Sequence, residues 1–457
     1  MVCIVAVIAV THVTAQTAGL TLTQDSKRAA VEKISSLLIE NYVSLDVADR
    51  CAKHIKSKFE AGAFDSITAN EEFAKSLTTE LQSISKDKHM RVRRRQPDDV
   101  RNNEMDPSRT QYRALRRSAD ENYGFRKVEI LDGNIGYIDM RYFAPTEAGR
   151  ETAIATMKFL ANTDAIIFDM RNNGGGNPDM IRLICSYFFD KPTHLNSLYY
   201  RKRNVTNEFW TLDRIEGKRR PDVPLFVLTS KRTFSGAEEF SYNMQTQKRA
   251  LLIGEVTGGG ANPGEMMPVN QTLGIFVPTG RAINPVTGTN WEGIGVRPEI
   301  EIDASKAYDI ALERAKKAAE EYHRQMEDTA VAVVSKAMSI LDKAREMFRQ
   351  NMLQEGDKLA QEALDTGMPS GILNESSIND LGYKYLGEGQ KLLALAIFKY
   401  NVEKHPASSN AYDSLAEGHM ENGQNELAIK FYRKSLELDP RNENARTTIR
   451  KLGGEVK

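Results

Sequence analysis

Three short apolar segments, each followed by a turn and a helical pattern, limit the folds open to this chain more than any other feature. The apolar segments are Ala165–Asp169, Leu225–Leu228 and Ala250–Gly254. Uninterrupted apolar runs of this length are typical of parallel strands that are buried on both faces. A further strand is expected over 135–141, and amphipathic helices are expected over 146–160, 178–188 and 235–247. The alternation predicts an α/β core in which helices cover the faces of a sheet.

The segment before this core has a helical pattern and then becomes charged. Apolar residues recur three and four positions apart between about Leu20 and Ser85, which predicts helices. The following stretch, Lys86–Tyr123, is weakly apolar and is expected to be irregular. Its most basic part, Lys86–Arg95, has no interleaved aromatic residues and is expected to form a solvated loop.

The segment after the core is also helical. Residues 304–354 are rich in Ala, Lys, Glu and Met, which predicts long helices. Beyond them the chain repeats at one constant spacing, in the pairs Leu381 and Leu415, Gly389 and Gly423, Ala394 and Ala428, and Pro406 and Pro440. This spacing is the period of tetratricopeptide repeats. Two repeats are clear, and the helices over 331–364 are expected to supply a degenerate third repeat or a cap.

Charge and hydropathy exclude two classes of partner. The chain has 62 basic and 62 acidic residues, so it has no net field that would gather nucleic acid or anionic membrane. The apolar stretch Met1–Val10 is too short to span a bilayer, and Val13–Ala15 before Gln16 suits signal-peptidase cleavage. No later segment qualifies as membrane-spanning. We therefore expect an exported protein, periplasmic or extracellular, with no integral membrane segment.

These patterns divide the chain into five segments. They are a signal peptide over 1–15, an N-terminal helical segment and linker over 16–125, an α/β core over 126–305, a connecting helix over 306–330, and an all-α tetratricopeptide-like module over 331–457. The cysteines fit neither a zinc nor a redox motif. Cys3 lies in the expected leader, while Cys51 and Cys185 form either a disulfide or two buried free thiols.

The stretch Thr233–Phe240 places a serine between a buried strand and a helix. The hydroxyl of Ser235 is expected at the positive end of the helix dipole, where developing negative charge is stabilised. Gly236 lets a substrate carbonyl approach the backbone N–H beside that serine. The alternative is purely structural, because Ser235 and Glu238 have the spacing of a capping box.

The loop Asp169–Pro178 contains three successive glycines directly after a buried strand. Glycines leave backbone N–H groups open to a ligand, so such a loop can bind an oxyanion or a phosphate. The loop lacks the Gly-Lys-Ser/Thr of a P-loop and the spacing of a dinucleotide fingerprint. A tight strand-to-helix turn is the alternative interpretation.

Two further motifs are Gly254–Ala261, with another run of glycines, and Asn290–Pro298, which contains Glu-Gly-Ile-Gly-Val. The four motifs, in this order, resemble those of the tail-specific (C-terminal processing) serine protease family, in the branch that includes interphotoreceptor retinoid-binding protein and the tricorn protease core. The resemblance covers roughly residues 135–302 and a helical segment before them. It implies a crotonase/ClpP-like βαβ superhelix and a serine peptidase activity.

The resemblance also implies the catalytic residues. Many members pair the nucleophile, here Ser235, with a lysine further along the chain, but the corresponding position is Gly260. The tricorn-like members use Ser, His and Glu, and the Glu of their Glu-Gly-Ile-Gly-Val motif matches Glu292. Their His matches His89, which lies in a stretch similar to the family's Asp-Gly-His. His194, in an expected turn after Pro192, remains the alternative base.

In the implied mechanism, the N–H groups of Gly236 and of either Gly175 or Gly176 hold the oxyanion. No metal or cofactor is required, and Asp169 and Arg171 are expected to brace the loop rather than react. A His base of ordinary pKa predicts that kcat/KM rises through roughly pH 6 to 7.

The expected partners are a protein or peptide substrate and a protein partner on the C-terminal repeats. Residues 91–132 are too short and too irregular for the PDZ domain with which processing relatives capture chain termini, which places strict tail recognition in doubt. The alternative to a peptidase is a non-catalytic binding protein for apolar ligands or peptides on the same fold.

Overall fold

The computed structural model describes residues 22–95 and 107–456, so the expected leader lies outside the described residues. The chain forms two compact units, which divide between Tyr322 and His323. The division falls inside one continuous helix, α9 (Ala304–Arg349).

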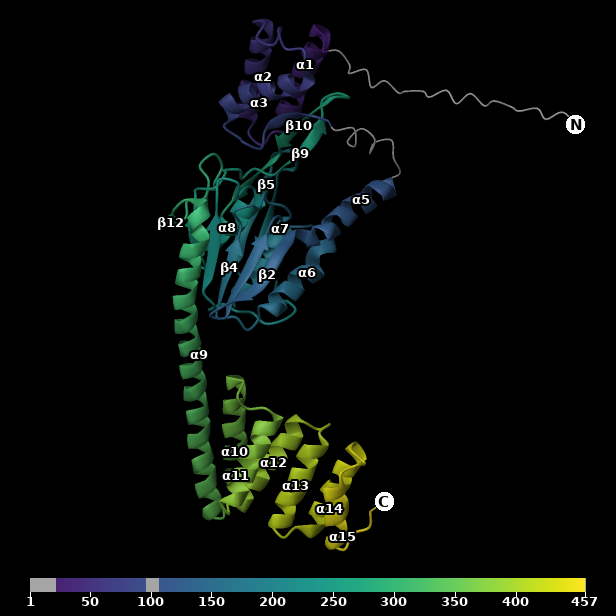
Figure 1. Cartoon of the computed structure of the whole chain (residues 1–457), viewed down its shortest axis with the longest axis vertical. Helices are drawn as coiled ribbons and strands as arrows, with labels where there is room; N and C mark the ends of the chain where they lie inside the picture. The colour runs from purple at the N-terminus through teal and green to yellow at the C-terminus, as the bar shows by residue number, and fades with distance from the viewer. Residues whose placement is uncertain (1–21, 96–106, 457) are drawn as a thin grey trace, which may run out of the picture. The chain divides into compact units, whose positions relative to one another are not determined.

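The core of the first unit is a six-stranded sheet in the order β12–β8–β7–β4–β3–β2 (Figure 1). Its strands are β2 (Phe125–Leu131), β3 (Ile135–Met140), β4 (Ala165–Asp169), β7 (Leu225–Thr229), β8 (Leu251–Gly254) and β12 (Ile300–Glu301). Neighbouring strands are parallel except in the β2–β3 hairpin. All residues of β4 and β7 are buried, so the expectation of a doubly covered, mainly parallel sheet is confirmed.

Helices cover both faces of this sheet (Figure 1). One face packs against α6 (Thr146–Phe159), α7 (Pro178–Cys185) and α8 (Gly236–Thr246). The first turns of α9 cover the other face through alanines at every fourth position, namely Ala307, Ala311, Ala315 and Ala319. This spacing puts the alanines on one side of the helix, and their small side chains let the helix backbone lie close to the strands.

A three-helix layer precedes the core and consists of α1 (Gln24–Asn41), α2 (Leu45–Glu60) and α3 (Asn70–Ser85). It packs on a small antiparallel sheet formed by β1 (Arg91–Arg94), β10 (Leu273–Pro278) and β9 (Gly264–Pro268). The expected solvated loop over 86–95 is therefore wrong. Met90 and Val92 are buried in this cluster, because pairing of β1 with β10 turns alternate residues of a basic stretch inward.

The remaining elements of the first unit lie at its periphery. A second antiparallel sheet contains β11 (Gly280–Ile283), β5 (His194–Tyr200) and β6 (Val205–Trp210). The helix α5 (Pro107–Asp120) corrects the expectation that 86–123 is irregular, since its polar sequence forms an amphipathic helix. Single 3-10 turns occur at Asn122–Gly124, Ser186–Phe188, Arg201–Arg203 and, in the second unit, Met368–Ser370.

The described part of the second unit consists of the end of α9 followed by shorter helices. They are α10 (Leu353–Gly367), α11 (Glu375–Gly387), α12 (Lys391–Lys404), α13 (Ser409–Glu421), α14 (Asn425–Leu438) and α15 (Glu443–Lys451). The starts of α11 and α13 are separated by the same number of residues as the starts of α12 and α14. This offset equals the repeat spacing found in the sequence. The turns within the two pairs use equivalent glycines with positive φ, 75° at Gly389 and 74° at Gly423. The expected helical repeat is therefore present in the backbone.

Cys51 and Cys185 are both buried and free, and they belong to different hydrophobic clusters. Of the two interpretations, free thiols are correct. None of the described helices is long and apolar enough to cross a bilayer.

Candidate active site

Ser235 connects β7 to α8 in a backbone conformation that L-residues rarely adopt. Its φ is 54° and its ψ is −121°. Strain of this kind persists only where the surroundings enforce it, and it clusters at active sites. The nucleophile of α/β-hydrolases occupies a similarly strained strand-to-helix turn. The Ser235 N–H donates to the Glu238 carboxylate at 2.8 Å, as in a capping box.

The glycine loop lies against this serine. A Cβ added to Gly175 would be 2.8 Å from the Ser235 Cβ, and one added to Gly236 would be 2.9 Å from the Gly176 nitrogen. The Gly175 N–H donates to Asn173 Oδ1 at 2.9 Å and is therefore engaged. Within the described residues, the N–H groups of Gly176 and Gly236 have no hydrogen-bond partner. The geometry thus leaves Gly176 and Gly236 as adjacent free donors.

The glycine loop also pairs with the segment after β3. The Gly174 N–H donates to the Arg141 carbonyl at 3.2 Å, and the Phe143 N–H donates to the Gly175 carbonyl at 2.9 Å. A cavity of about 490 Å³ opens beside this segment and is lined in part by Arg141 and Tyr142. The cavity therefore lies beside the segment to which the glycine loop is hydrogen-bonded.

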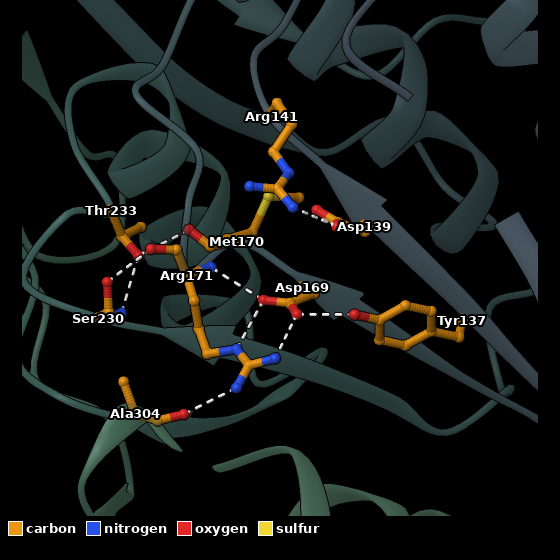
Figure 2. Close-up of polar contacts among 9 residues, drawn as sticks. All are labelled: Tyr137, Asp139, Arg141, Asp169, Met170, Arg171, Ser230, Thr233 and Ala304. Carbon is orange, nitrogen blue, oxygen red and sulfur yellow. Dashed lines mark hydrogen bonds and ion pairs between the residues drawn. The ribbon is translucent and has the colours of Figure 1, made fainter. Parts of the chain in front are cut away.

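A buried ion pair braces the ends of the strands beneath these loops (Figure 2). The Arg171 guanidinium donates twice to the Asp169 carboxylate, at 2.9 and 2.6 Å, and once to the Ala304 carbonyl at 2.8 Å. The Tyr137 hydroxyl donates to the same carboxylate at 2.7 Å. The Ser230 hydroxyl donates to the Arg171 carbonyl at 2.6 Å. These bonds tie the loop after β4 to the loop after β7, which carries Ser235.

Glu238 is a second connector, and it is fully buried. Besides the Ser235 N–H, its carboxylate accepts the Thr257 hydroxyl at 2.5 Å and the N–H groups of Gly259 and Gly260 at 2.6 and 2.8 Å. The capping-box spacing thus reflects a real contact, but the carboxylate does more than cap. It fixes the third glycine loop against the start of α8.

His89 lies in the short turn between α3 and β1 and is 7% exposed. Its ring packs on Phe234, the residue before Ser235, with ring centroids 4.5 Å apart. Its Nδ1 is enclosed and has no hydrogen-bond partner. Its backbone N–H donates to Asp87 Oδ1 at 3.0 Å. The structure therefore brings His89 next to the segment that carries Ser235, although the two are far apart in sequence.

Glu292 and Asp87 lie beside this imidazole. One carboxylate oxygen of each and one ring nitrogen of His89 all lie within 4.8 Å of one another. Glu292 Oε2 accepts the N–H groups of Ala261 and Asn262, at 2.6 and 3.1 Å, while its Oε1 is enclosed without a partner. The histidine is thus flanked by two acids, of which the sequence argument identified only Glu292.

The electrostatics of the three groups follow from their burial. Burial, helped by the positive charge of Arg91, lowers the pKa of His89 to about 4. Burial and then the nearby Asp87 charge raise the pKa of Glu292 to about 8. Burial also raises the pKa of Asp87 above its ordinary value. At neutral pH these directions keep the imidazole neutral, as a general base must be.

Gly260, the position at which lysine-dependent members of the resembled family carry their base, has no room for a side chain. A Cβ there would lie 2.6 Å from His89 Cε1 and 2.3 Å from Phe234 Cζ. The His89 ring therefore occupies the space into which a residue at 260 would extend.

The alternative base, His194, is not in a turn. It begins β5, its Nε2 lies 3.1 Å from the Asn196 carbonyl and 2.9 Å from Ser197 Oγ, and its ring stacks on Trp210. The strand β5 pairs with β6 on one side and with β11 on the other, and His194 itself pairs with Trp210 of β6. Hydrogen bonds and stacking within the peripheral sheet account for His194.

Sequence reasoning missed three site residues. Asp87 stands two positions before His89, so the Asp-x-His spacing was the available signal. Asn262, which donates to Asp87 Oδ2 at 2.9 Å, and Phe234, which supports the imidazole, carried no signal that spacing could detect. Their roles depend on contacts between segments that are distant in the sequence.

Two family models match parts of the chain. The model described as peptidase family S41 matches residues 134–302. This match supports assignment of residues 134–302 to peptidase family S41. The model described as the N-terminal domain of peptidase S41 in eukaryotic IRBP matches residues 16–123. The expected resemblance is confirmed at the level of the family, and the S41 fold here has a mixed α/β core with helical regions before and after it.

Curated relatives include carboxy-terminal-processing proteases from a bacterium and a plant. The carboxy-terminal-processing protease of Bartonella bacilliformis is 26% identical over 191 residues, which is 40% of this chain and 43% of that protein. The chloroplastic carboxyl-terminal-processing peptidase 2 of Arabidopsis thaliana is 29% identical over 168 residues, 36% of this chain and 31% of that protein. The chain thus spans less than half the length of these relatives.

Among solved structures, a putative peptidase from Parabacteroides merdae aligns with a TM-score of 0.47 and 18% identity, over 63% of this chain and 96% of that one. The tricorn protease aligns with a TM-score of 0.41 and 13% identity, over 65% of this chain and 37% of that one.

Proposed function

We propose that this S41 protein is a serine peptidase in which Ser235 is the nucleophile, His89 the general base and Glu292 the acid that orients it. The observation that carries the proposal is the strained backbone of Ser235 beside two unpartnered N–H groups. A helix cap alone does not need that conformation, since N-cap residues ordinarily have extended φ and ψ. We also propose that the core follows the βαβ superhelix implied by the family resemblance.

In the proposed reaction, Ser235 Oγ attacks the carbonyl carbon of a peptide bond and transfers its proton to His89 Nε2. We assign this role to Nε2 because Nδ1 is enclosed. The imidazolium then protonates the leaving amine, and a water hydrolyses the acyl-enzyme by the same path in reverse. Glu292 holds the Nδ1–H tautomer and stabilises the imidazolium.

The N–H groups of Gly176 and Gly236 are proposed to bind the oxyanion. They are fixed before the substrate arrives, which is the property that makes such donors effective. Gly176 has a φ of 140°, and a Cβ there would lie 2.1 Å from the Phe143 carbonyl oxygen. Only glycine fits at this position, so the donor cannot be exchanged for a residue with a side chain.

The proposed substrate is a protein or peptide segment. The described residues between β1 and β2 contain only α5 and a 3-10 turn, so they offer no PDZ-like element for a free C-terminus, and we propose cleavage without strict tail recognition. The helical repeat of the second unit is proposed to be of the tetratricopeptide type and to bind a protein partner or substrate. We also propose that the protein is exported.

The proposal is tested by hydrolysis of an unstructured protein such as casein. The Ser235→Ala variant should lose activity by several orders of magnitude, the residual rate being that of the oxyanion site alone, about 10³-fold or more above water. Ser241→Ala is the matched control, because Ser241 is buried in the same helix and its hydroxyl donates only to the Ala237 carbonyl. If Ser235→Ala and wild type were equally active, Ser235 would not be the nucleophile, and the binding-protein interpretation would replace the proposed function.

A further inference from the structure

The cluster of Asp87, His89 and Glu292 has more hydrogen-bond acceptor atoms than the surrounding donors satisfy. Its three ligand atoms lie within 4.8 Å of one another. His89 Nδ1 and Glu292 Oε1 are both enclosed and have no hydrogen-bond partner. Buried polar atoms are nearly always paired with protein or with a bound group. Two unpaired buried atoms within one such cluster indicate that a further group can bind there.

The cluster also lacks a cation. Asp87 Oδ2 accepts only neutral donors, namely the Tyr42 hydroxyl at 3.1 Å and Asn262 Nδ2 at 2.9 Å. Among the residues that the structure describes, no ion pair involves Asp87 or Glu292. The neighbouring Lys88 Nζ donates instead to the Gly258 carbonyl at 2.5 Å. A buried and a partly buried carboxyl group with no counter-charge are expected either to keep a proton or to hold a metal ion.

We propose that Asp87, His89 and Glu292 form a binding site for one divalent transition metal ion of the Zn²⁺ class. One imidazole nitrogen and two carboxylate oxygens are ligands that Zn²⁺ accepts, with an exchangeable water in the fourth position. The charge of the ion offsets that of both carboxylates. Metal–ligand distances of about 2.0–2.1 Å require the three atoms to move closer together, and binding displaces the long hydrogen bond from Tyr42.

The consequence for activity rests on the proposed function. A metal ion on His89 Nδ1 and Glu292 Oε1 takes the two atoms that would otherwise orient the imidazole as a base. The ion would therefore inhibit the peptidase reversibly, and a chelator would restore activity. The site then acts as a metal-dependent switch on the base and leaves Ser235 and the glycine loops unchanged.

The binding claim is tested with the full-length Ser235→Ala protein, made without a polyhistidine tag, so that catalysis plays no part. Co²⁺ serves as the probe, because its visible absorption reports coordination by nitrogen and oxygen ligands. We expect saturable binding of about one equivalent, displaced by Zn²⁺. Adding His89→Gln, Asp87→Asn or Glu292→Gln should each weaken it at least tenfold, because even outer partners of a metal site cost about 10–100-fold.

The matched control is His54→Gln, since His54 pairs with Glu80 at 2.6 Å outside the cluster. This variant should bind Co²⁺ like its parent. Absence of binding up to millimolar Co²⁺, or loss of binding in His54→Gln and not in His89→Gln, would overturn the proposed site. Circular dichroism establishes that each variant is folded. If the wild-type protein binds Co²⁺ but has no peptidase activity, the proposed function is refuted and the metal site is supported.

Discussion

The two halves of the candidate site are built in different ways. The nucleophile half, Ser235 with the glycine loop, belongs to two strand–loop–helix units of the core, and part-buried hydrogen bonds that involve Arg171 and Glu238 tie its loops together. The base half joins His89 from the N-terminal layer to Glu292 from a distant loop, and each contributes an enclosed atom without a partner. The nucleophile half is therefore preorganised, whereas the base half is poised to change its protonation or its ligand.

This contrast separates the expected effects of mutation. Changes in the nucleophile half should lower the rate at every pH, because they alter position. Changes in the base half should also move the pH dependence, because they alter charge. The predictions below test that separation.

The largest effect within the base half is expected from His89→Ala. Removal of a general base typically costs about 10²–10⁴-fold in rate, so kcat/KM for a small peptide should fall by about that factor. His194→Ala should retain most of the activity, since His194 bonds within its own sheet. If His194→Ala lost activity and His89→Ala kept it, His194 would be the base, and the contrast between the two halves would not hold.

Glu292→Gln should cost less, about 10²-fold, because the His89 backbone remains held by Asp87. The wild-type pH profile is more informative. A protonated Glu292 would donate a hydrogen bond to His89 Nδ1, and the imidazole proton would then be on Nε2. Nε2 could no longer accept the proton of Ser235, so activity requires the ionised carboxylate. The raised pKa of Glu292, about 8, then predicts that kcat/KM rises toward pH 8 and not around the ordinary pKa of histidine.

Asp87→Asn tests the cause of that shift. The charged or titratable groups around Glu292 are Asp87, Glu238, His89 and Tyr42, and Asp87 is the acid that raises its pKa most. Removing this charge should move the midpoint of the profile to lower pH, measured with a chelator present. Asp49→Asn, an exposed acid paired with Lys53, should leave the midpoint in place. A wild-type midpoint at about 6.5, the ordinary pKa of histidine, would contradict the assigned role of Glu292.

A smaller effect is expected from Arg171→Lys in the nucleophile half. Lysine cannot reproduce the paired bonds to Asp169 and the bond to the Ala304 carbonyl together. A displacement of about 1 Å costs up to about 10²-fold, so we expect kcat to fall about tenfold with little change in KM, melting temperature or pH profile.

The control for this variant is Arg220→Lys, because Arg220 donates to the Thr163 hydroxyl and the Leu160 carbonyl before the opposite end of β4. It should affect stability more than kcat. A shift in the pH profile of Arg171→Lys would show that the two halves are not separable.

The smallest effect is expected from ending the chain at 330. This truncation keeps the part of α9 that packs on the core, including Tyr322, and removes most of the second unit. Hydrolysis of small peptides should change less than about threefold, since each helical repeat contacts mainly its neighbours. A selective loss of protein cleavage would assign substrate recruitment to the repeats, and failure to fold would contradict the independence of the first unit.

The sequence predicted one half of the site better than the other for a physical reason. The strands Ala165–Asp169 and Leu225–Thr229 and the loops after them are short-range features, so apolar runs and glycines located Ser235 and the glycine loop. The constant repeat spacing likewise predicted the paired helices of the second unit. Asp87 and Asn262 are 175 residues apart and meet only because β1 pairs with β10. No local pattern encodes that pairing, and the basic composition of 86–95 concealed it.

The central claim is that Ser235 is an activated nucleophile, and labelling by a fluorophosphonate tests it most directly. Peptide mass spectrometry should locate the adduct on Ser235 in wild type and in Ser241→Ala, with no adduct in Ser235→Ala and slower labelling in His89→Ala. Labelling of Ser235→Ala at the wild-type rate would contradict the claim. So would a folded wild type that no fluorophosphonate modifies between about pH 6 and about pH 9, a range that samples both the protonated and the ionised forms of the acid and the base.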